Sequence, residues 1–229
     1  MKTFELLAQA KSPDGTAIQL KRRDDEYVIL AAGRHLMSSR MHASEESLAA
    51  HGCRRAATLP RPSVLIGGLG MGYTLRAALD LLPPRATIFV AELIAEIVDW
   101  NRGPLAPLAG HPLTDPRVRV EILDVAATLR TRSVQFDAIL LDVDNGPGAF
   151  TDSANAAIYS DSGIAAASAS LRPGGTLAVW SAREDLKFAH RLRAAKFTVH
   201  IEHTRAHASK GPRHAIYLAQ KSNPTTQPR

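Results

Sequence analysis

The chain has 229 residues, of which 45% are hydrophobic and 22% charged, so it can bury the core of one large domain with a small appendage and is not disordered throughout. Its formal net charge of +6 is spread along the chain and indicates a solvated basic surface; because no aromatic-and-basic motif accompanies it, we do not expect nucleic acid as a partner. A single cysteine excludes a disulfide framework within the chain. No apolar run reaches the roughly 18 residues of a membrane span, and the first residues lack the apolar core of a signal peptide. We therefore expect a cytoplasmic protein with no membrane contact.

The first 58 residues differ from the rest and predict a small N-terminal β domain with one helix. Residues 18–22 alternate apolar and polar side chains, and a second apolar run follows a charged turn, which is typical of an antiparallel hairpin. A helical segment follows at 44–50, with Ser44 as its expected N-cap. Two prolines then mark the boundary to a second domain, 59–220, and the polar segment 221–229 predicts a flexible tail.

In the second domain, short apolar runs alternate with helical segments. The predicted strands are residues 64–66, 87–91, 118–122, 138–141 and 176–180. The predicted helices are residues 73–82, 94–101, 154–171 and 185–195. A turn is expected at Pro173-Gly174-Gly175, and the last two strands, 197–203 and 214–219, predict a C-terminal antiparallel hairpin. Repeated strand–helix units indicate an α/β fold with a doubly wound, mostly parallel Rossmann-like sheet, which binds its ligands beyond the carboxyl ends of the strands.

The strongest local signal is a glycine-rich loop directly after the first strand of this domain. It reads Gly67-Gly68-Leu69-Gly70-Met71-Gly72, and its spacing differs from the G-x-G-x-x-G of dinucleotide-binding proteins. Glycines let the backbone approach a ligand closely, and the N-terminus of the following helix favours polar or anionic groups. The loop therefore indicates binding of a nucleoside without a pyrophosphate, such as S-adenosylmethionine; the alternative is a tight strand–helix turn that binds nothing.

Two acidic residues follow the next two strands. Glu92 lies 20 residues after Gly72, where a carboxylate can accept hydrogen bonds from both ribose hydroxyls. Its alternative role is to cap the following helix. Asp124, just past the third strand, lies where an adenine-binding acceptor is expected.

The segment after the fourth strand carries the candidate catalytic residues. It reads Asp142-Val143-Asp144-Asn145-Gly146-Pro147, which places two carboxylates and an amide at the mouth of the sheet. Such groups can orient an amine nucleophile or take its proton. The same residues also suit an Asx-type turn, and a turn can present a catalytic side chain.

These motifs together resemble the spermidine synthase (polyamine aminopropyltransferase) family, which shares the fold of class I S-adenosylmethionine-dependent methyltransferases. The resemblance extends over about residues 27–220. The quoted segments that resemble the family are the glycine-rich loop, Ala91-Glu92-Leu93, Asp115-Pro116-Arg117-Val118, Leu123-Asp124 and the segment that begins at Asp142. The resemblance implies that Glu92 binds ribose, Asp124 binds adenine and Asp142 binds the reacting amine region. It also implies a homodimer joined partly through the N-terminal β domain.

The chain departs from the family pattern mainly on the side of the polyamine. Gly70 or Met71 stands where the family carries an aspartate in the glycine-rich loop, and Asn145 stands where its second catalytic aspartate belongs, unless Asp144 substitutes. Three further departures lie before the loop, at Leu36, Met41 and Glu45, where the family has a glutamine, an aspartate and a substrate-contacting tyrosine. The nucleoside half of the site therefore matches the family, and the polyamine half does not.

We predict an S-adenosylmethionine-dependent group transferase and favour methyl transfer to a small-molecule acceptor, since a neutral glycine loop does not repel the carboxylate of S-adenosylmethionine. Asp142, with Asp144 and Asn145, would orient the acceptor and accept its proton. Aminopropyl transfer from decarboxylated S-adenosylmethionine to a polyamine or another amine is the first alternative, and a non-catalytic nucleoside- or RNA-binding protein is the second. Histidines cluster near the C-terminal hairpin (His200, His203, His207 and His214), but their spacing does not predict a metal site.

Overall fold

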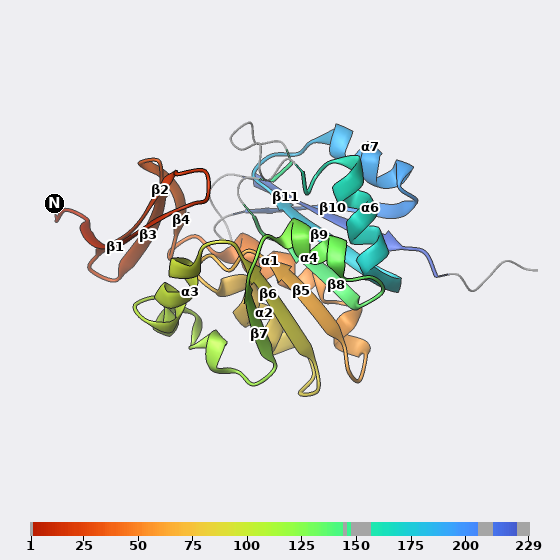
Figure 1. Ribbon diagram of the computed structural model, residues 1–229, viewed down its shortest axis with the longest axis horizontal. Helices are drawn as coiled ribbons and strands as arrows, with labels where there is room; N and C mark the ends of the chain where they lie inside the picture. The colour runs from red at the N-terminus through yellow and green to blue at the C-terminus, as the bar shows by residue number, and fades with distance from the viewer. Residues whose placement is uncertain (1, 144–145, 148–156, 206–212, 224–229) are drawn as a thin grey trace, which may run out of the picture.

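The computed structural model describes residues 2–143, 146–147, 157–205 and 213–223, and it folds them into two β-sheets with helices. A small sheet of four strands comes first along the chain, and a sheet of seven strands follows. Figure 1 shows the small sheet beside the larger α/β body rather than within it.

The N-terminal sheet is antiparallel, with strand order β1-β2-β3-β4. Its strands are β1 (Glu5–Lys11), β2 (Ala17–Arg23), β3 (Glu26–Ala31) and β4 (Arg34–Ser38). The predicted hairpin is confirmed as β2 and β3, which pair from Ile18 opposite Ala31 to Arg23 opposite Glu26. The sequence did not predict β1 and β4, because few of their side chains are fully buried and no apolar alternation marks them.

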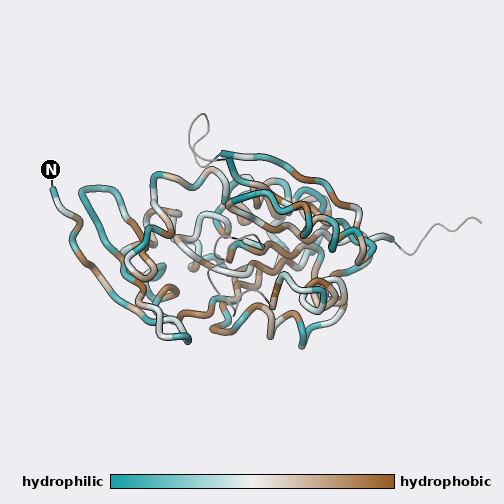
Figure 2. The backbone as a smooth tube through the Cα atoms, turned by 90° about the horizontal axis from the view of Figure 1, so that it is seen from above, coloured by the Kyte–Doolittle hydropathy of each residue, from teal (hydrophilic) through white to brown (hydrophobic). Residues whose placement is uncertain are grey.

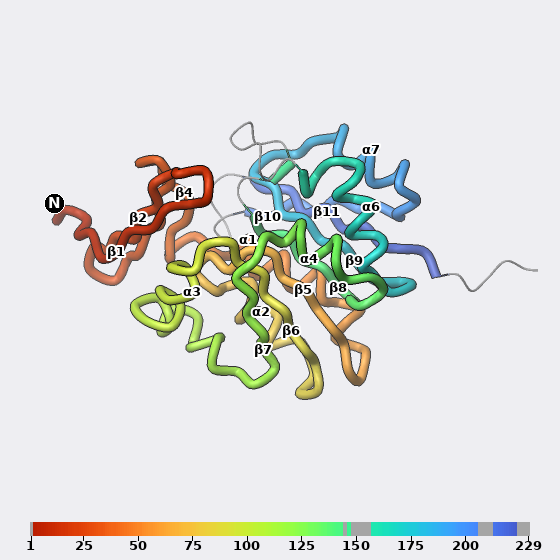
Figure 3. The backbone as a smooth tube through the Cα atoms, in the orientation of Figure 1, coloured from red at the N-terminus to blue at the C-terminus, as the bar shows by residue number. Residues whose placement is uncertain are grey.

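The larger sheet confirms the predicted fold class. Its strands are β5 (Ser63–Gly67), β6 (Thr87–Glu92), β7 (Val118–Ile122), β8 (Phe136–Leu141), β9 (Leu171–Ser181), β10 (Phe197–Arg205) and β11 (Arg213–Lys221). They lie in the order β10-β11-β9-β8-β5-β6-β7, with β5 to β9 parallel and the predicted C-terminal hairpin, β10 and β11, antiparallel at one edge. The colours of Figure 3 show that the chain adds β6 and β7 on one side of β5 and later strands on the other. Such a reversal leaves a crevice at the carboxyl ends of the central strands.

Helices cover both faces of this sheet. On one face lie α1 (Ala43–Gly52), α2 (Tyr73–Leu81) and α3 (Ala95–Arg102), and on the other lie α4 (Val125–Thr131), α6 (Asp161–Ser170) and α7 (Leu186–Ala194). Each face has its own apolar core: Leu48 and Leu75 belong to the first, Leu129 and Phe188 to the second. Figure 2 shows hydrophobic segments along the strands in the middle of the molecule. The sheet is therefore a rigid platform for the loops at its carboxyl edge.

Two helix predictions are corrected. Helix α1 has His42 as its N-cap, so Ser44, predicted to be the cap, lies inside the helix, where its hydroxyl donates to the Glu45 carboxylate at 2.5 Å. The helix predicted over residues 154–171 begins at Asp161, since the Ser160 hydroxyl accepts the N–H of Gly163 and caps it there. Residues 154–156 of that prediction lie outside the described residues.

The sequence also missed α4 and misplaced a turn. The expected turn at Pro173-Gly174-Gly175 is instead an irregularity within β9: Phe136 of β8 pairs with Leu171, and two residues later Ala138 pairs with Thr176. The extra residues bend out of the ladder, which Gly174 permits with a φ of +71°. The strand therefore begins before the glycines, where the sequence predicted a helix end.

Helix α1, which we expected in the N-terminal domain, packs against α2 and against β8 and β9 of the larger sheet. At the other end of the chain, β11 continues to Lys221, whose ammonium group donates to the carbonyl oxygens of Ser168 and Leu171 at 2.6 and 2.7 Å. Residues 224–229 of the predicted tail lie outside the described residues. The domain boundaries at 58/59 and 220/221 stay predictions.

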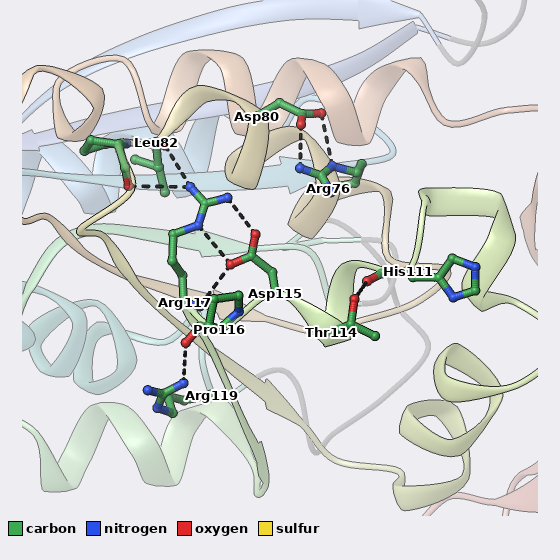
Figure 4. A network of polar contacts seen from close by, with 10 residues as sticks. Arg76, Asp80, Leu82, His111, Thr114, Asp115, Pro116, Arg117 and Arg119 are labelled. Atoms are coloured by element: carbon green, nitrogen blue, oxygen red, sulfur yellow. Dashed lines mark hydrogen bonds and ion pairs between the residues drawn. The ribbon is translucent and has the colours of Figure 1, made fainter.

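The segment before β7, which contributed to the family resemblance, has a structural role. The Arg117 guanidinium donates to the Asp115 carboxylate at 2.8 Å and to the carbonyl oxygen of Leu82 at 2.8 Å, as Figure 4 shows. Arg117 thereby holds the pKa of Asp115 below its ordinary value through hydrogen bonding. This network joins the end of α2 to the amino end of β7, at the edge of the sheet opposite the predicted ligand site. Within the described residues, no helix is long and apolar enough to cross a membrane.

Candidate active site

The glycine-rich loop leaves β5 at the centre of the sheet and joins three strand ends. The N–H of Gly68 donates to Ala91 at the end of β6, and the N–H of Asp142 donates to Gly67, both at 2.9 Å. Gly68 has a φ of +87°, and a Cβ built on it would stand 2.4 Å from the carbonyl oxygen of Asp142. Only glycine fits there, because any side chain would push the end of β8 away from β5.

The remaining glycines of the loop also pack closely against neighbouring residues. A Cβ on Gly70, with a φ of +53°, would stand 2.6 Å from the Met37 methyl group of β4, so the N-terminal sheet reaches over the loop. Gly72 is the N-cap of α2 with a φ of +84°, and Gly67 is the last residue of β5. The predicted loop therefore brings bare backbone to the start of a helix, as a nucleoside site requires.

Glu92 braces this loop. It is only 5% exposed, and its carboxylate accepts the N–H of Leu69 at 2.8 Å and the N–H of Ile94 at 2.9 Å. Burial raises the pKa of Glu92, while these backbone donors act in the opposite direction. The carboxylate of Glu92 therefore fixes the backbone of the glycine-rich loop to the end of β6.

Asp124, predicted to bind adenine, has a structural role in the described chain. Its Oδ1 accepts the N–H of Ala126 at 2.9 Å, which makes Asp124 the N-cap of α4. Glu92, for which we considered helix capping, does not cap α3, whose N-cap Ile94 has no side-chain cap hydrogen bond. The side chain is half-buried, and its Oδ2 has no hydrogen bond to any described residue.

An apolar rim that the sequence analysis did not single out borders these two carboxylates. Leu93, Ile122 and Leu123 are large hydrophobic side chains with 40%, 58% and 43% exposure, which is high for their type. They lie at the ends of β6 and β7, where the N–H of Leu123 donates to the carbonyl oxygen of Glu92 at 3.0 Å. An exposed apolar rim beside polar acceptors suits an aromatic base. The sequence feature that could have predicted this rim is the apolar residue next to each strand-end carboxylate.

Asp142 follows β8 on the opposite side of the glycine loop. It is partly buried, and its Oδ2 accepts the hydroxyl of Thr74 in α2 at 2.6 Å. Burial raises the pKa of Asp142 to about 6, against the lowering effect of the Thr74 hydrogen bond. A carboxylate with such a pKa can accept a proton near neutral pH. The other predicted catalytic residues, Asp144 and Asn145, lie outside the described residues.

The structure brings a second carboxylate, Glu45, into the neighbourhood of Asp142. Glu45 belongs to α1 and is only 9% exposed. Burial, and then the charge of Asp142, raises the pKa of Glu45 to about 7. In the sequence, Glu45 was notable only as a departure from the pattern of the resembled family. The sequence feature that could have pointed to Glu45 is an acidic residue near the start of a predicted helix with no basic residue expected beside it.

The side chains around this pair are aromatic. The ring of His42 stacks on the ring of Tyr73, with centroids 4.1 Å apart and an angle of 15° between the planes. His42 also contacts Glu46 through Nδ1 at 2.8 Å, and the hydroxyl of Tyr73 donates to the carbonyl oxygen of Ser39 at 3.3 Å. Burial, and then the charges of Glu45 and Glu46, raises the pKa of Tyr73 to about 12. Tyr73 therefore stays protonated and uncharged beside the carboxylates.

The C-terminal histidines take no part in this site. His200 contacts Glu202 and His203 contacts Glu184, each at 2.9 Å, and His214 lies against Trp180 with ring centroids 4.8 Å apart. His207 is outside the described residues. Within the described part of the chain, no group of three or more histidine, cysteine, aspartate or glutamate side chains converges as a metal site.

Comparisons with known proteins identify similar structures but no sequence relative. No family model matches the chain, and no curated protein matches its sequence. The spermidine synthase from Thermotoga maritima superimposes with a TM-score of 0.75 at 19% identity, covering 95% of this chain and 73% of that one. A spermidine synthase in complex with the transition state analogue AdoDATO gives 0.73 at 18% identity, with 95% and 72% covered. A probable spermidine synthase from Corynebacterium glutamicum ATCC 13032 gives 0.62 at 18% identity, with 96% and 81% covered.

The predicted resemblance to spermidine synthases is thus confirmed at the level of the fold. The similarity extends over nearly the whole chain, so it includes the N-terminal sheet as well as the Rossmann-like sheet. At identities below 20% it shows the fold alone, and the activity of this chain has to be argued from its own residues.

Proposed function

We propose that this protein transfers an aminopropyl group from decarboxylated S-adenosylmethionine to a small-molecule amine. The observation that carries the proposal is the arrangement at the carboxyl edge of the sheet. There, the glycine loop braced by Glu92 lies on one side, and the carboxylates of Asp142 and Glu45 lie on the other. The likeness to spermidine synthase structures supports this choice over methyl transfer.

The residues present fit a sulfonium nucleoside. Glu92 lies at the strand end where a carboxylate would accept from ribose hydroxyls, and the Oδ2 of Asp124 is available for an adenine amino group. The rim of Leu93, Ile122 and Leu123 offers apolar surface to the base. The absence of a Cβ at Gly68 and Gly70 lets the end of β8 and Met37 of β4 pack directly against the loop, which holds the loop in place at the carboxyl edge of the sheet.

On the acceptor side, residues of this chain orient the acceptor nitrogen and provide a base for its proton. When bound, a sulfonium nucleoside supplies an electrophilic carbon, which forms a bond to the acceptor nitrogen as its bond to sulfur breaks and a neutral thioether leaves. Thr74 fixes the Asp142 carboxylate, and Asp142 holds the nitrogen in line and takes up the proton that it loses. The neighbouring rings of His42 and Tyr73 limit the access of water.

The charge of the site favours the decarboxylated donor. Within the described residues, no lysine, arginine or histidine forms an ion pair with Glu45, Glu92, Asp124 or Asp142. The carboxylate of intact S-adenosylmethionine would therefore enter a site with negative charges and no fixed counter-ion, whereas a donor without it would not.

Methyl transfer from intact S-adenosylmethionine is the second candidate, because Gly70 leaves the loop neutral where the resembled family carries an aspartate. The nucleoside product distinguishes the two reactions. We expect methylthioadenosine, detected by mass spectrometry, when purified protein is incubated with decarboxylated S-adenosylmethionine and a panel of amines. S-adenosylhomocysteine from the intact donor would instead establish methyl transfer. If neither product forms, the non-catalytic binding role is favoured.

The proposal includes a homodimer, as the resemblance implies, in the cytoplasm, as we expect from the sequence. Light scattering coupled to size-exclusion chromatography tests the oligomeric state, with a molar mass of twice the chain mass as the expected result.

A further inference from the structure

Asn101 is a buried polar residue of α3 that the proposed function does not use. It is only 1% exposed, and its Nδ2 donates to two carbonyl oxygens, that of Gly70 in the glycine-rich loop at 2.8 Å and that of Ile97 in its own helix at 2.9 Å. The first of these bonds joins residues that are 31 positions apart in the sequence. Asn101 therefore connects the helix that follows β6 with the loop that follows β5.

This asparagine is costly for the helix that carries it. Its Oδ1 is buried and accepts no hydrogen bond from any described residue. A buried acceptor without a donor lowers the stability of a protein, and asparagine is a poorer helix former than leucine or alanine. The other buried residues of α3 are all hydrophobic, namely Ile97, Val98 and Trp100. A hydrophobic side chain would suit position 101 better, so the reason for an asparagine has to lie outside the helix.

The glycine-rich loop needs an outside contact at Gly70. Gly70 has a φ of +53°, which glycine adopts about as readily as a negative φ, so the backbone alone does not select this conformation. Its neighbours are held by other bonds: the N–H of Leu69 donates to Glu92, and the N–H of Gly72 donates to the carbonyl oxygen of Leu69, both at 2.8 Å. Among the described residues, only Asn101 donates to the carbonyl oxygen of Gly70.

The amide of Asn101 also lies against the start of α2. A Cβ built on Gly72, the N-cap of α2, would stand 2.9 Å from the Oδ1 of Asn101. One side chain thus contacts the loop at Gly70 through its donor and lies beside Gly72 with its acceptor. The turn from the loop into α2 is the part of the candidate site that a nucleoside would approach, so Asn101 supports this turn from within the protein.

We propose that Asn101 is a positioning residue for nucleoside binding, which fixes the Gly70 carbonyl so that the loop holds its binding conformation before a ligand is present. This inference rests on the proposed function, since it requires the nucleoside to lie on the glycine-rich loop. Asn101 is too deeply buried to touch the ligand. A loop that is ordered in advance costs the ligand less conformational entropy, so the effect of Asn101 should appear in the affinity for the nucleoside and hardly in kcat.

The test separates affinity from stability with variants of α3 in the whole protein. Asn101→Leu removes the donor to Gly70 together with the unpartnered acceptor. We expect its midpoint of urea unfolding to stay at the wild-type value or to rise. By calorimetry, methylthioadenosine should bind to it at least about tenfold more weakly than to the wild type. Asn101→Ala removes the same donor without adding volume and should weaken binding to a similar degree.

The matched control is Val98→Ala, because it truncates a fully buried side chain of the same helix and leaves the bond to Gly70 in place. It should lower the midpoint of urea unfolding, as the loss of buried methyl groups does. Its affinity for methylthioadenosine should change by less than about twofold, since the loop keeps its contact. A residue with a merely structural role would instead lose affinity in step with stability.

Hydrogen exchange measures the order of the loop directly. In the ligand-free Asn101→Leu protein, peptides that contain the glycine-rich loop should exchange at least about fivefold faster than in the wild type. Saturation with methylthioadenosine should bring the two rates together. Wild-type affinity and wild-type loop exchange in both Asn101 variants would overturn the inference, as would an equal loss of affinity in Val98→Ala. Failure of the proposed function looks different: methylthioadenosine would not bind to the wild type, and this inference would fall with it.

Discussion

The carbonyl oxygen of Asp142 lies 2.4 Å from the point where a Cβ on Gly68 would stand, so the end of β8 can lie against the glycine-rich loop only because residue 68 has no side chain. This contact couples the two halves of the site: moving either one displaces the other. Gly68 is thus a structural requirement of the site even before a ligand is considered.

Replacing Gly68 by alanine therefore has two costs, a left-handed backbone and a clash. The matched control is Gly15→Ala, because Gly15 has nearly the same φ, +89° against +87°, and open space around it. We expect Gly15→Ala to lower the free energy of unfolding by about 1–2 kcal/mol, and Gly68→Ala to lower it by at least about 2 kcal/mol more. Urea unfolding measures both, and equal losses would contradict the tight approach.

If Asp142 takes the proton in the proposed reaction, the hydrogen bond that it accepts from Thr74 should affect the pH dependence of that reaction. The Thr74 hydroxyl lowers the pKa of Asp142, which burial raises to about 6. Thr74→Val should raise that pKa further and move the acidic limb of the log kcat profile to higher pH, whereas Thr74→Ser keeps the hydroxyl and should leave the profile in place. An unchanged profile in Thr74→Val would show that Asp142 is not the group that takes the proton.

The brace formed by Glu92 predicts a loss of stability together with a loss of nucleoside binding. Glutamine has one acceptor oxygen, so Glu92→Gln leaves the N–H of either Leu69 or Ile94 facing an amide N–H. We expect the free energy of unfolding to fall by about 1–3 kcal/mol, the usual cost of an unsatisfied buried donor. Glu96→Gln, an exposed site in the following helix, is the control. Equal stability of the two variants in urea would mean that Glu92 does not hold the loop.

Glu45 should destabilise the ligand-free protein above neutral pH. Its pKa is raised from 4.5 to about 7 in the folded state, so the folded protein keeps a proton that the unfolded chain loses, and the free energy of unfolding falls as the pH rises from about 4.5 to about 7. Glu45→Gln should therefore gain on the order of 2 kcal/mol at pH 8 and nothing at pH 4. Urea unfolding across this range, with Glu46→Gln as the control, checks it; a variant less stable than wild type at pH 8 would contradict the buried charge.

The fold was predictable because its signals are local. The alternation of apolar runs with helical segments located β7 to the residue, and the glycines after β5 predicted both the loop and the start of α2. The positions of Glu92, Asp124 and Asp142 followed from the rule that parallel strands present their carboxyl ends at one edge.

The acceptor side was not predictable from spacing. Glu45 precedes Asp142 by 97 residues, and the two meet only because α1 folds back onto β8 and β9 rather than staying with the N-terminal sheet. Local patterns carry no information on that packing. The helix-capping role of Asp124 was not predicted either: the sequence predicted only adenine binding there, and the backbone geometry shows that Asp124 caps α4.

The most direct test of the central claim is calorimetric binding of decarboxylated S-adenosylmethionine and of intact S-adenosylmethionine to the purified protein. The arrangement of unpaired carboxylates predicts that both bind at the glycine loop and that the decarboxylated form binds at least about tenfold tighter. Tighter binding of the intact form would contradict aminopropyl transfer in favour of methyl transfer, and binding of neither would refute the nucleoside site itself.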